Sequence, residues 1–422
     1  MATGRIGQTG RIAPKVNGDR LWKRLMALAR FGATGGGGVN RQALSDEEVA
    51  ARAELIHWGE AAGLAPSNDD AANLFLAYPG RDENLPPVIV GSHIDSQPTG
   101  GKFDGAFGVL AALESVEAII ASGLRPLRTI EVVSWMNEEG SRFAPGMMGS
   151  AVFTGARKIE DILELRDKAG ISVREERDKV LAAEARVPRR RARAPSAYLE
   201  AHIEQGPILQ NENKTIGVVT GIQGKRTFRV QIEGEENHAG TSPRNARRDA
   251  LVSAVGVVQA LQDAMWDRGD IVRFTVGMFT VTPNAPSVVP SRVVFSVDLR
   301  HPEASVLTRL GDAIPDICRD AAGKCTATVK QLLHEPPLTF PDLTRSTIRL
   351  AAETLGIPCA DIASGAGHDA RYLHYVCPTG MIFIPCKDGI SHNEAESIRK
   401  EDAADGARVL AEAVFAIANA GS

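Results

Sequence analysis

Short apolar runs alternate with helical patterns along the first part of the chain, and this alternation constrains the fold more than any other feature. The patterns predict strands over 73–78, 87–91 and 129–136, and a helix over 104–121 that ends at Gly123. Strands separated by helices need crossover connections, which favour a mostly parallel sheet. We therefore expect an α/β fold: a mixed, mostly parallel sheet flanked by helices.

Two further helices are predicted ahead of this region, and one more at the end of the chain. Asp19 can cap a helix that reaches Ala29, and Ser45 with Glu48 fits a capping box that opens a helix to about Ala62. A strand over 381–385 and a final helix over 400–418 would complete the same domain.

The pattern changes after Glu212 and predicts an inserted domain. Strands are expected over 227–232, 271–280 and 292–299, and helices over 246–265 and 303–321. This β-α-β-β-α order indicates a compact α+β domain with one sheet face and one helical face. We assign residues 215–330 to this insert, and residues 1–214 and 331–422 to the first, discontinuous domain.

Composition excludes several classes of protein. The 422 residues suffice for two to three domains at about 150 residues each. A net charge of -4 gives no general attraction to nucleic acid or anionic lipid. The polar N-terminus lacks the apolar core of a secretory signal, and prolines interrupt the longest uncharged run, 274–291, so we expect no membrane span. Five cysteines without CxxC spacing favour a reducing cytoplasm.

The charged segment 158–194 contains five arginines between Arg186 and Arg193. A basic run can contact nucleic acid, but this one is short and has acidic neighbours. We therefore predict a solvated connector.

Histidines and carboxylates follow several of the apolar segments, at His93, Asp95, Asp104, Glu138, Glu139, His202 and His392. Each has an ordinary explanation on its own: Asp104 can cap a helix, Glu138 and Glu139 can lie in a solvated loop, and a single histidine is often a hydrogen-bonding residue. Together they form a nitrogen and oxygen ligand set suited to Zn²⁺, Mn²⁺ or Co²⁺. The lack of thiolates favours a catalytic over a structural metal site.

Six motifs that contain these residues resemble one enzyme family in unbroken order: GSHIDSQPTGGKFDGAFGVL, NEEGSRF, EAHIEQGPIL, NHAGTSP, SGAGHDA and KDGISHNEAE. They are similar to the motifs of the family of N-carbamoyl-L-amino-acid hydrolase, β-ureidopropionase and allantoate amidohydrolase, which belongs to a superfamily of dinuclear-metal aminoacylases and exopeptidases. The resemblance runs from about Phe31 to the end of the chain.

The resemblance implies two divalent ions per subunit, with Zn²⁺ expected and Mn²⁺ or Co²⁺ as alternatives. Asp104 would bridge both ions, with His93 and His202 completing one site and Glu139 and His392 the other. Asp95 would fix the ring of His93. Glu138 would be the general base that moves a proton from water to the leaving nitrogen.

The resemblance also implies substrate contacts and a homodimer. His238 would stabilise the oxyanion in the active site of the partner subunit, and the insert would serve as a dimerisation and lid domain. Gln205 and Arg300 would hold the substrate, since an arginine suits a carboxylate. The loop around Gly367 would either offer its backbone N–H groups to the substrate or be organised by His368 and Asp369.

One position departs from the family pattern. Ser287 stands where relatives have an asparagine that helps to hold the substrate. We therefore expect the carboxylate end of the substrate to be held differently, for example by Asn284.

The leading hypothesis for the activity is hydrolysis of the carbamoyl C–N bond of N-carbamoyl-L-amino acids, which yields amino acid, CO₂ and NH₃. Allantoate or another ureido acid is the second candidate substrate, and an aminoacylase or dipeptidase activity is the third. A metal-containing binding protein without turnover is the fourth hypothesis, against which Glu138 argues because binding needs no general base. No nucleic-acid or membrane partner is expected.

Overall fold

The computed structural model describes residues 14–420, which form two compact units. Unit 1 comprises the chain up to Thr220, Phe340–Ile362 and the chain from Gly367 onward. Unit 2 comprises Gly221–Thr339 and Ala363–Ala366. The first thirteen residues of the N-terminus interpreted above lie outside the described residues. Within residues 14–420, no helix has the length and apolar character needed to cross a membrane.

Nine of the described strands form one mixed sheet in the order β1-β2-β4-β3-β5-β16-β6-β14, with β15 paired to β6. Its strands are β1 (Ala65–Asn68), β2 (Leu74–Tyr78), β3 (Val88–His93), β4 (Ile130–Trp135), β5 (Ala197–Ile203), β6 (Ile216–Ile222), β14 (Leu338–Thr339), β15 (Cys359–Ser364) and β16 (Thr379–Ile384). The four central strands β4, β3, β5 and β16 run parallel, and β2 and β6 pair antiparallel at either side of them. The predicted mixed sheet with helices around it is confirmed.

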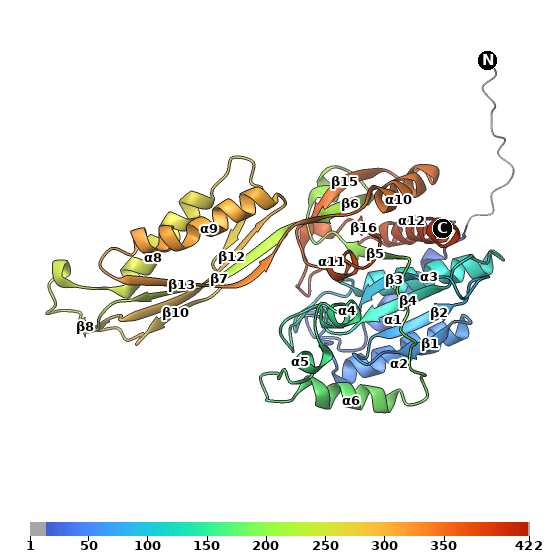
Figure 1. The fold of residues 1–422 in the computed structure, drawn as a ribbon, viewed down its shortest axis with the longest axis horizontal. Coiled ribbons are helices and arrows are strands. Elements are labelled where there is room, and N and C mark those ends of the chain that lie inside the picture. Colours follow the sequence, from blue (N-terminus) through green and yellow to red (C-terminus); the bar gives the residue numbers. More distant parts are fainter. Residues whose placement is uncertain (1–13, 421–422) are drawn as a thin grey trace, which may run out of the picture. The chain divides into compact units, whose positions relative to one another are not determined.

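Unit 1 also contains the helices around this sheet, of which α3, α10 and α12 pack against its strands (Figure 1). They are α1 (Gly18–Leu28), α2 (Asp46–Ala61), α3 (Ala106–Ala121), α4 (Met148–Phe153), α5 (Ile159–Leu163), α6 (Val173–Ala183), α7 (Ile208–Asn211), α10 (Asp342–Thr354), α11 (Ala370–Leu373) and α12 (Lys400–Asn419). The apolar helix α3 is buried on nearly all sides because it packs against β3, α1 and α12. This packing fixes the first turn of α3, where the loop that carries Asp104 ends.

Strand β5 shows how the sheet separates its core from its polar side. Leu199 and Ala201 point into the main apolar core. Successive side chains alternate between faces, so Glu200 and His202 point to the other face, where the Ala370 N–H of α11 donates to Glu200. The alternation thus carries His202 out of the core.

Two predicted helix starts differ in detail. Asn17, not Asp19, caps α1, because its side chain accepts the N–H of Arg20 while Asp19 already lies in the first turn. Ser45 caps α2 as predicted, but Glu48 accepts the N–H of Leu44, so only half of the capping box forms.

The segment 158–194 is only partly the solvated connector that the sequence predicts. Arg186 and Arg189 are exposed and pair with Glu60 and Asp70, but the segment also contains α5 and α6. Arg190 is nearly buried, pairs with Glu131 at 2.7 Å and lies 4.5 Å from the ring centroid of Phe75. The partner of Arg190 is 59 residues away along the chain, which a local charge pattern does not reveal.

Unit 2 contains a five-stranded sheet in the order β10-β12-β7-β13, with β9 also paired to β12. Its elements are β7 (Gly224–Glu233), β9 (Arg273–Thr275), β10 (Phe279–Thr282), β12 (Arg292–His301), β13 (Thr326–Glu335), α8 (Ala250–Met265), α9 (Ala304–Ala321), and a two-stranded ladder of β8 (Asn237–His238) and β11 (Val288–Val289). Short 3₁₀ turns lie at Arg244–Ala246 and Lys387–Gly389, the second in unit 1. Helices α8 and α9 lie side by side on one face of the sheet (Figure 1).

The expected insert differs from unit 2 in three respects. The strand predicted over 271–280 is two strands, β9 and β10. The break between them is held by Ser296, because the Met278 N–H donates to the Ser296 hydroxyl and the Ser296 N–H donates to the Met278 carbonyl. The unit runs from 221 to 339 rather than from 215 to 330, since residues 216–222 continue the large sheet as β6 and β13 extends past 330. Helix α8 begins at Ala250 because Asp249 caps it.

Candidate metal centre and active site

The five predicted metal ligands converge at one edge of the large sheet. His93 is the last residue of β3, His202 is next to last in β5, and Glu139 follows β4. Asp104 precedes α3, and His392 comes from the loop before α12. Parallel strands of an α/β sheet present their carboxyl ends at a common edge, which is where such folds place ligand sites.

The side chains form two groups that share Asp104: His93, Asp104 and His202 in one, and Asp104, Glu139 and His392 in the other. Within each group one ligand atom per residue lies within 4.8 Å of the others. Asp104 Oδ1 is 3.1 Å from His202 Nε2, and its Oδ2 is 3.3 Å from His392 Nε2. The arrangement provides two adjacent three-residue sites joined by one carboxylate.

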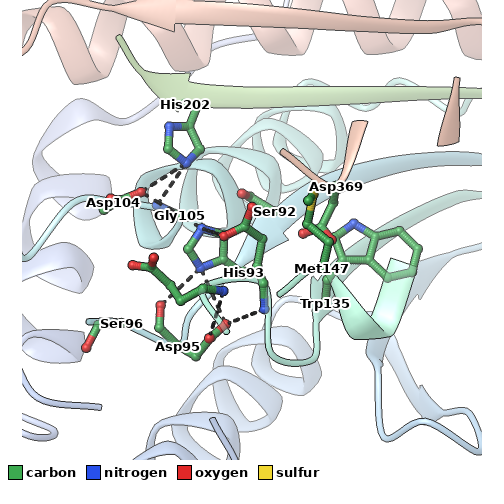
Figure 2. Close-up of polar contacts among 12 residues, drawn as sticks. Ser92, His93, Asp95, Ser96, Asp104, Gly105, Trp135, Met147, His202 and Asp369 are labelled. Carbon is green, nitrogen blue, oxygen red and sulfur yellow. Dashed lines mark hydrogen bonds and ion pairs between the residues drawn. The ribbon is translucent and has the colours of Figure 1, made fainter. Parts of the chain in front are cut away.

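The histidine tautomers fit metal binding. Nδ1 of His93 donates to the carbonyl of Asp95 at 3.0 Å, and Nδ1 of His202 donates to the carbonyl of Ile203 at 2.9 Å. Nδ1 of each ring therefore carries a proton, and Nε2 of both rings faces Asp104 (Figure 2). Nε2 can face this buried carboxylate only if a cation, a proton or a metal ion, lies between the two groups, so this donor set fits a divalent ion.

Asp104 does not cap α3, which excludes the ordinary explanation of this residue. The N-cap of α3 is Gly105, and no side chain bonds to the first turn. Gly105 has φ +61, and a Cβ there would lie 2.3 Å from the ring of His93. Burial would raise the pKa of Asp104, but its bonds with His202 and His392 outweigh burial and hold the pKa well below its ordinary value.

Asp95 connects the two strands that carry the site. Its carboxylate accepts the N–H groups of Glu138 at 3.1 Å and of Glu139 at 3.2 Å. The same carboxylate lies 3.5 Å from Nδ1 of His93, and Figure 2 shows the ring between Asp95 and Asp104. Asp95 therefore fixes a histidine and the Glu138–Glu139 backbone at once.

Glu138 and Glu139 are not in a solvated loop, since their side chains are 11% and 4% exposed. Burial raises the pKa of Glu139 to about 7 and that of Glu138 well above its ordinary value, and neighbouring carboxylates add to the rise. Oε2 of Glu138 lies 3.6 Å from Nε2 of His93. Glu138 is absent from both ligand groups, so it lies beside them with its carboxylate available for proton transfer.

Two predicted substrate residues of unit 1 lie at or near this centre. Gln205 donates from Nε2 to Asp104 at 2.9 Å, and its buried Oε1 has no hydrogen-bond partner among residues 14–420. Gly367 lies against the Met147 side chain, with Met147 Cε 3.4 Å from where a Cβ would stand. An acceptor on Gln205 is thus left for a ligand.

The other three predicted residues lie in unit 2, at opposite ends of its sheet. His238 pairs with Val288 in the small ladder, and Asn284 lies in the turn before that strand, near Arg292. Arg300 is at the other end of β12, eight residues from Arg292, which spans about 26 Å at 3.3 Å per residue. Within one chain, His238 and Arg300 cannot contact the same small molecule.

Sequence reasoning assigned no role to Glu396, which the structure places beside the ligands. Its Oε1 accepts the N–H groups of Phe103 at 2.9 Å and Asp104 at 3.0 Å, and its Oε2 accepts from Ser391 Oγ at 3.0 Å. Glu396 belongs to the quoted motif KDGISHNEAE, but nothing in the motif separates it from Glu394. Only the structure separates the two residues, because it shows that Glu396 is buried, with 5% of its surface exposed.

A third group of Glu200, His202 and His368 also brings ligand atoms together. Both oxygens of Glu200 are engaged, one by Ser92 Oγ at 2.7 Å and the other by Tyr198 and the Ala370 N–H. This carboxylate therefore orders the polar side of β5, and His202 uses its Nε2 toward Asp104.

Comparison with known proteins places the chain in a family. The sequence profile of peptidase family M20/M25/M40 matches residues 89–416. An N-carbamoyl-L-amino-acid amidohydrolase of Rhizobium meliloti is 41% identical over 95% of this chain and 96% of its own. An allantoate amidohydrolase of Bacillus subtilis is 32% identical over 93% of this chain and 95% of its own.

The fold agrees with these relatives. The crystal structure of an amidase of the hydantoinase/carbamoylase family from Burkholderia multivorans has a TM-score of 0.89 and 43% identity, and the match covers 97% of this chain and all of that one. The relatives are hydrolases that act on C–N bonds, and the predicted resemblance is confirmed. The chain belongs to peptidase family M20/M25/M40 and is a hydrolase of its amidohydrolase branch.

Proposed function

We propose that this enzyme hydrolyses the carbamoyl C–N bond of N-carbamoyl-L-amino acids, releasing the amino acid, CO₂ and NH₃. The observation that carries the proposal is the pair of ligand groups joined by Asp104 with the buried carboxylate of Glu138 beside them. The name of the 41% identical relative supports the substrate class.

Two divalent ions would be held by the residues predicted from the sequence, with Zn²⁺ expected and Mn²⁺ or Co²⁺ as alternatives. His93 and His202 would hold one ion and Glu139 and His392 the other, with Asp104 between them. Bound ions of this kind lower the pKa of water and polarise a carbonyl group.

Glu138 would take the proton of the attacking water on its carboxylate and deliver it to the departing nitrogen. Asp95 would support this step because its carboxylate fixes both the backbone of Glu138 and the ring of His93. A water molecule adds to the carbamoyl carbon, the C–N bond breaks, and the carbamate decomposes to CO₂ and NH₃, so the atoms balance.

Substrate binding would use the residues that the resemblance names. The unpartnered Oε1 of Gln205 would accept an N–H of the ureido group, and Arg300 would bind the carboxylate. Gly367 would offer its backbone to the substrate. Asn284 would contact it from the turn beside His238.

We propose a homodimer, which the positions of His238 and Arg300 support. His238 lies beyond the Arg292 end of β12, and the strand spans about 26 Å from Arg292 to Arg300, so the two residues would reach one substrate only from two subunits. The outer face of α8 exposes Val252 at 68% and Val255 at 58%, which supports a contact between unit 2 of each copy. Unit 2 would then serve as the dimerisation and lid domain.

Allantoate and β-ureido acids are the second substrate class, because relatives at 32% identity are named allantoate amidohydrolases. Ser287 removes an amide from the turn that would contact the substrate and favours neither class. The spacing of the five cysteines in the sequence supports a location in a reducing cytoplasm.

The test is ammonia release from purified protein loaded with Zn²⁺, Mn²⁺ or Co²⁺. We expect turnover of N-carbamoyl-L-amino acids with a higher kcat/KM than allantoate, N-carbamoyl-β-alanine or N-acetyl amino acids. A higher kcat/KM for any of those three would reassign the substrate, and the absence of ammonia from all of them would refute the activity.

A further inference from the structure

Three basic residues stand in one row across unit 2. Strand pairing places Arg300 of β12 directly opposite Lys225 of β7 and, on its other side, opposite Arg273 of β9. Directly opposed residues share a sheet face, and like charges in that position destabilise a sheet unless anions compensate. Three acids lie beside the row: Asp298, two residues before Arg300; Glu335 of β13, opposite Lys225; and Asp270, whose Oδ1 is 3.1 Å from Arg273 Nη1.

Asp298 is shared by two of these cations. Its Oδ1 accepts from Arg300 Nε at 2.9 Å, and its Oδ2 accepts from Arg300 Nη2 at 3.2 Å. The same Oδ2 lies 3.2 Å from Lys225 Nζ. Burial would raise the pKa of Asp298, but Arg300 and Lys225 outweigh it and lower the pKa, so the carboxylate stays ionised.

The donors of the two cations exceed the acceptors around them. A guanidinium has five N–H groups. Asp298 takes two from Arg300, and the carbonyl of Gly365 takes one through Nη1 at 3.0 Å. Lys225 uses one of its three N–H groups on Asp298. Two N–H groups on each cation therefore remain, at side chains that are about 30% exposed.

We infer that Lys225 is a second cation of the substrate-carboxylate site and that Asp298 positions both cations. Because Asp298 occupies the Nε edge of the guanidinium, the substrate carboxylate binds the Nη1–Nη2 edge of Arg300, and the ammonium of Lys225 binds it from the side. This inference rests on the proposed function, in which Arg300 receives the carboxylate. Lys225 also supplies a hydrogen-bond donor to the carboxylate end of the substrate, where Ser287 stands in place of the asparagine of the relatives.

The experiment compares Lys225→Met, Lys225→Arg and Asp298→Asn with the exposed control Lys330→Met of β13, all in the metal-loaded full chain. For an N-carbamoyl-L-amino acid, we expect Lys225→Met and Asp298→Asn to raise KM about tenfold or more with kcat within a factor of two to three. Lys225→Arg should restore most of the affinity, and Lys330→Met should match the wild type. The KM for the corresponding N-carbamoyl amino-acid amide, which lacks the carboxylate, should not change.

Calorimetric titration of each protein with the same carbamoyl amino acid separates this inference from the proposed function. If the wild type binds the acid without turnover and Lys225→Met loses the binding, the activity is refuted and the site stands. If Lys225→Met matches the wild type in KM and in binding, or if its defect is equal for the acid and the amide, the inference is overturned. Failure of the wild type to bind any carboxylate would overturn it as well.

Discussion

Replacing Glu396 by alanine tests whether the loop that carries His392 is held to the loop that carries Asp104. The change removes a nearly buried carboxylate that accepts two backbone N–H groups, at 2.9 and 3.0 Å, and one hydroxyl at 3.0 Å. Leaving the two N–H groups unpaired should cost about 3–6 kcal/mol of unfolding free energy, at about 1.5–3 kcal/mol per bond to a charged acceptor. Glu396→Gln should cost only about 1 kcal/mol, because an amide oxygen can accept both N–H groups.

The metal sites should weaken along with the fold. Loss of a group that orients ligands typically lowers metal affinity by about 10–100-fold. Gly101→Ala provides a second route to the same defect, because a Cβ at Gly101 would lie 2.0 Å from Oε1 of Glu396. Glu394→Gln is the matched control. Glu394 lies in the same loop as Glu396, but it accepts a hydrogen bond from Thr34 and belongs to neither ligand group.

Urea unfolding of the metal-free protein, followed by tryptophan fluorescence, measures the stability of unit 1, which holds Trp22, Trp58 and Trp135 of the four tryptophans. Equilibrium dialysis with elemental analysis measures the bound ions. If Glu396→Ala unfolds at the wild-type urea concentration and binds two ions with wild-type affinity, then Glu396 does not anchor the site and our reasoning is wrong.

Three further predictions address the base, the buried acids and the dimer. Glu138→Gln should lower kcat by about 10²–10⁴-fold at unchanged metal content, as steady-state kinetics and elemental analysis would show; a variant with wild-type kcat would exclude Glu138 as the base. Burial raises the pKa of Glu48 from 4.5 to about 7, so the folded state binds this proton more tightly and stability from this group falls as pH rises from about 4.5 to 7. Glu48→Gln should therefore stabilise the protein by about 3 kcal/mol at pH 8 and by little at pH 4.5, and equal denaturation curves at pH 8 would contradict this. Val255→Lys should convert a dimer to monomers in light scattering and abolish activity with metal still bound, whereas an active monomer would show that His238 does not act across subunits.

The sequence predicts three of the four central strands, β3, β4 and β16, because strands buried on both faces leave continuous apolar runs that local patterns detect. It does not predict β5, whose sequence AYLEAHI is interrupted by the polar Glu200 and His202. It fails where the decisive partner is distant. The break between β9 and β10 depends on Ser296, and the burial of Arg190 depends on Glu131, neither of which a local window contains. The same reason explains why Asn17 rather than Asp19 caps α1: both residue types cap helices, and only the path of the chain decides between them.

The candidate site shows a similar division. The residue types at strand exits predict nitrogen and oxygen ligands, and the family resemblance distributes them over two ions around Asp104. Glu138 and Glu139 are adjacent and chemically identical, so residue type alone does not separate base from ligand. The resemblance assigns the two roles, and in the structure Glu139, not Glu138, lies in a group with His392. The sequence pattern does not indicate Glu396 or Lys225, because only the groups that they contact in the folded chain distinguish them from other residues of the same type.

The most direct test of the account is the metal content of active enzyme. Chelation followed by graded reloading, with bound metal and ammonia release measured on the same samples, should show activity that rises with loading up to two divalent ions per chain, and an Asp104→Ala protein should bind neither ion tightly. Full activity of the wild type after exhaustive chelation, with less than one ion per chain, would contradict the account.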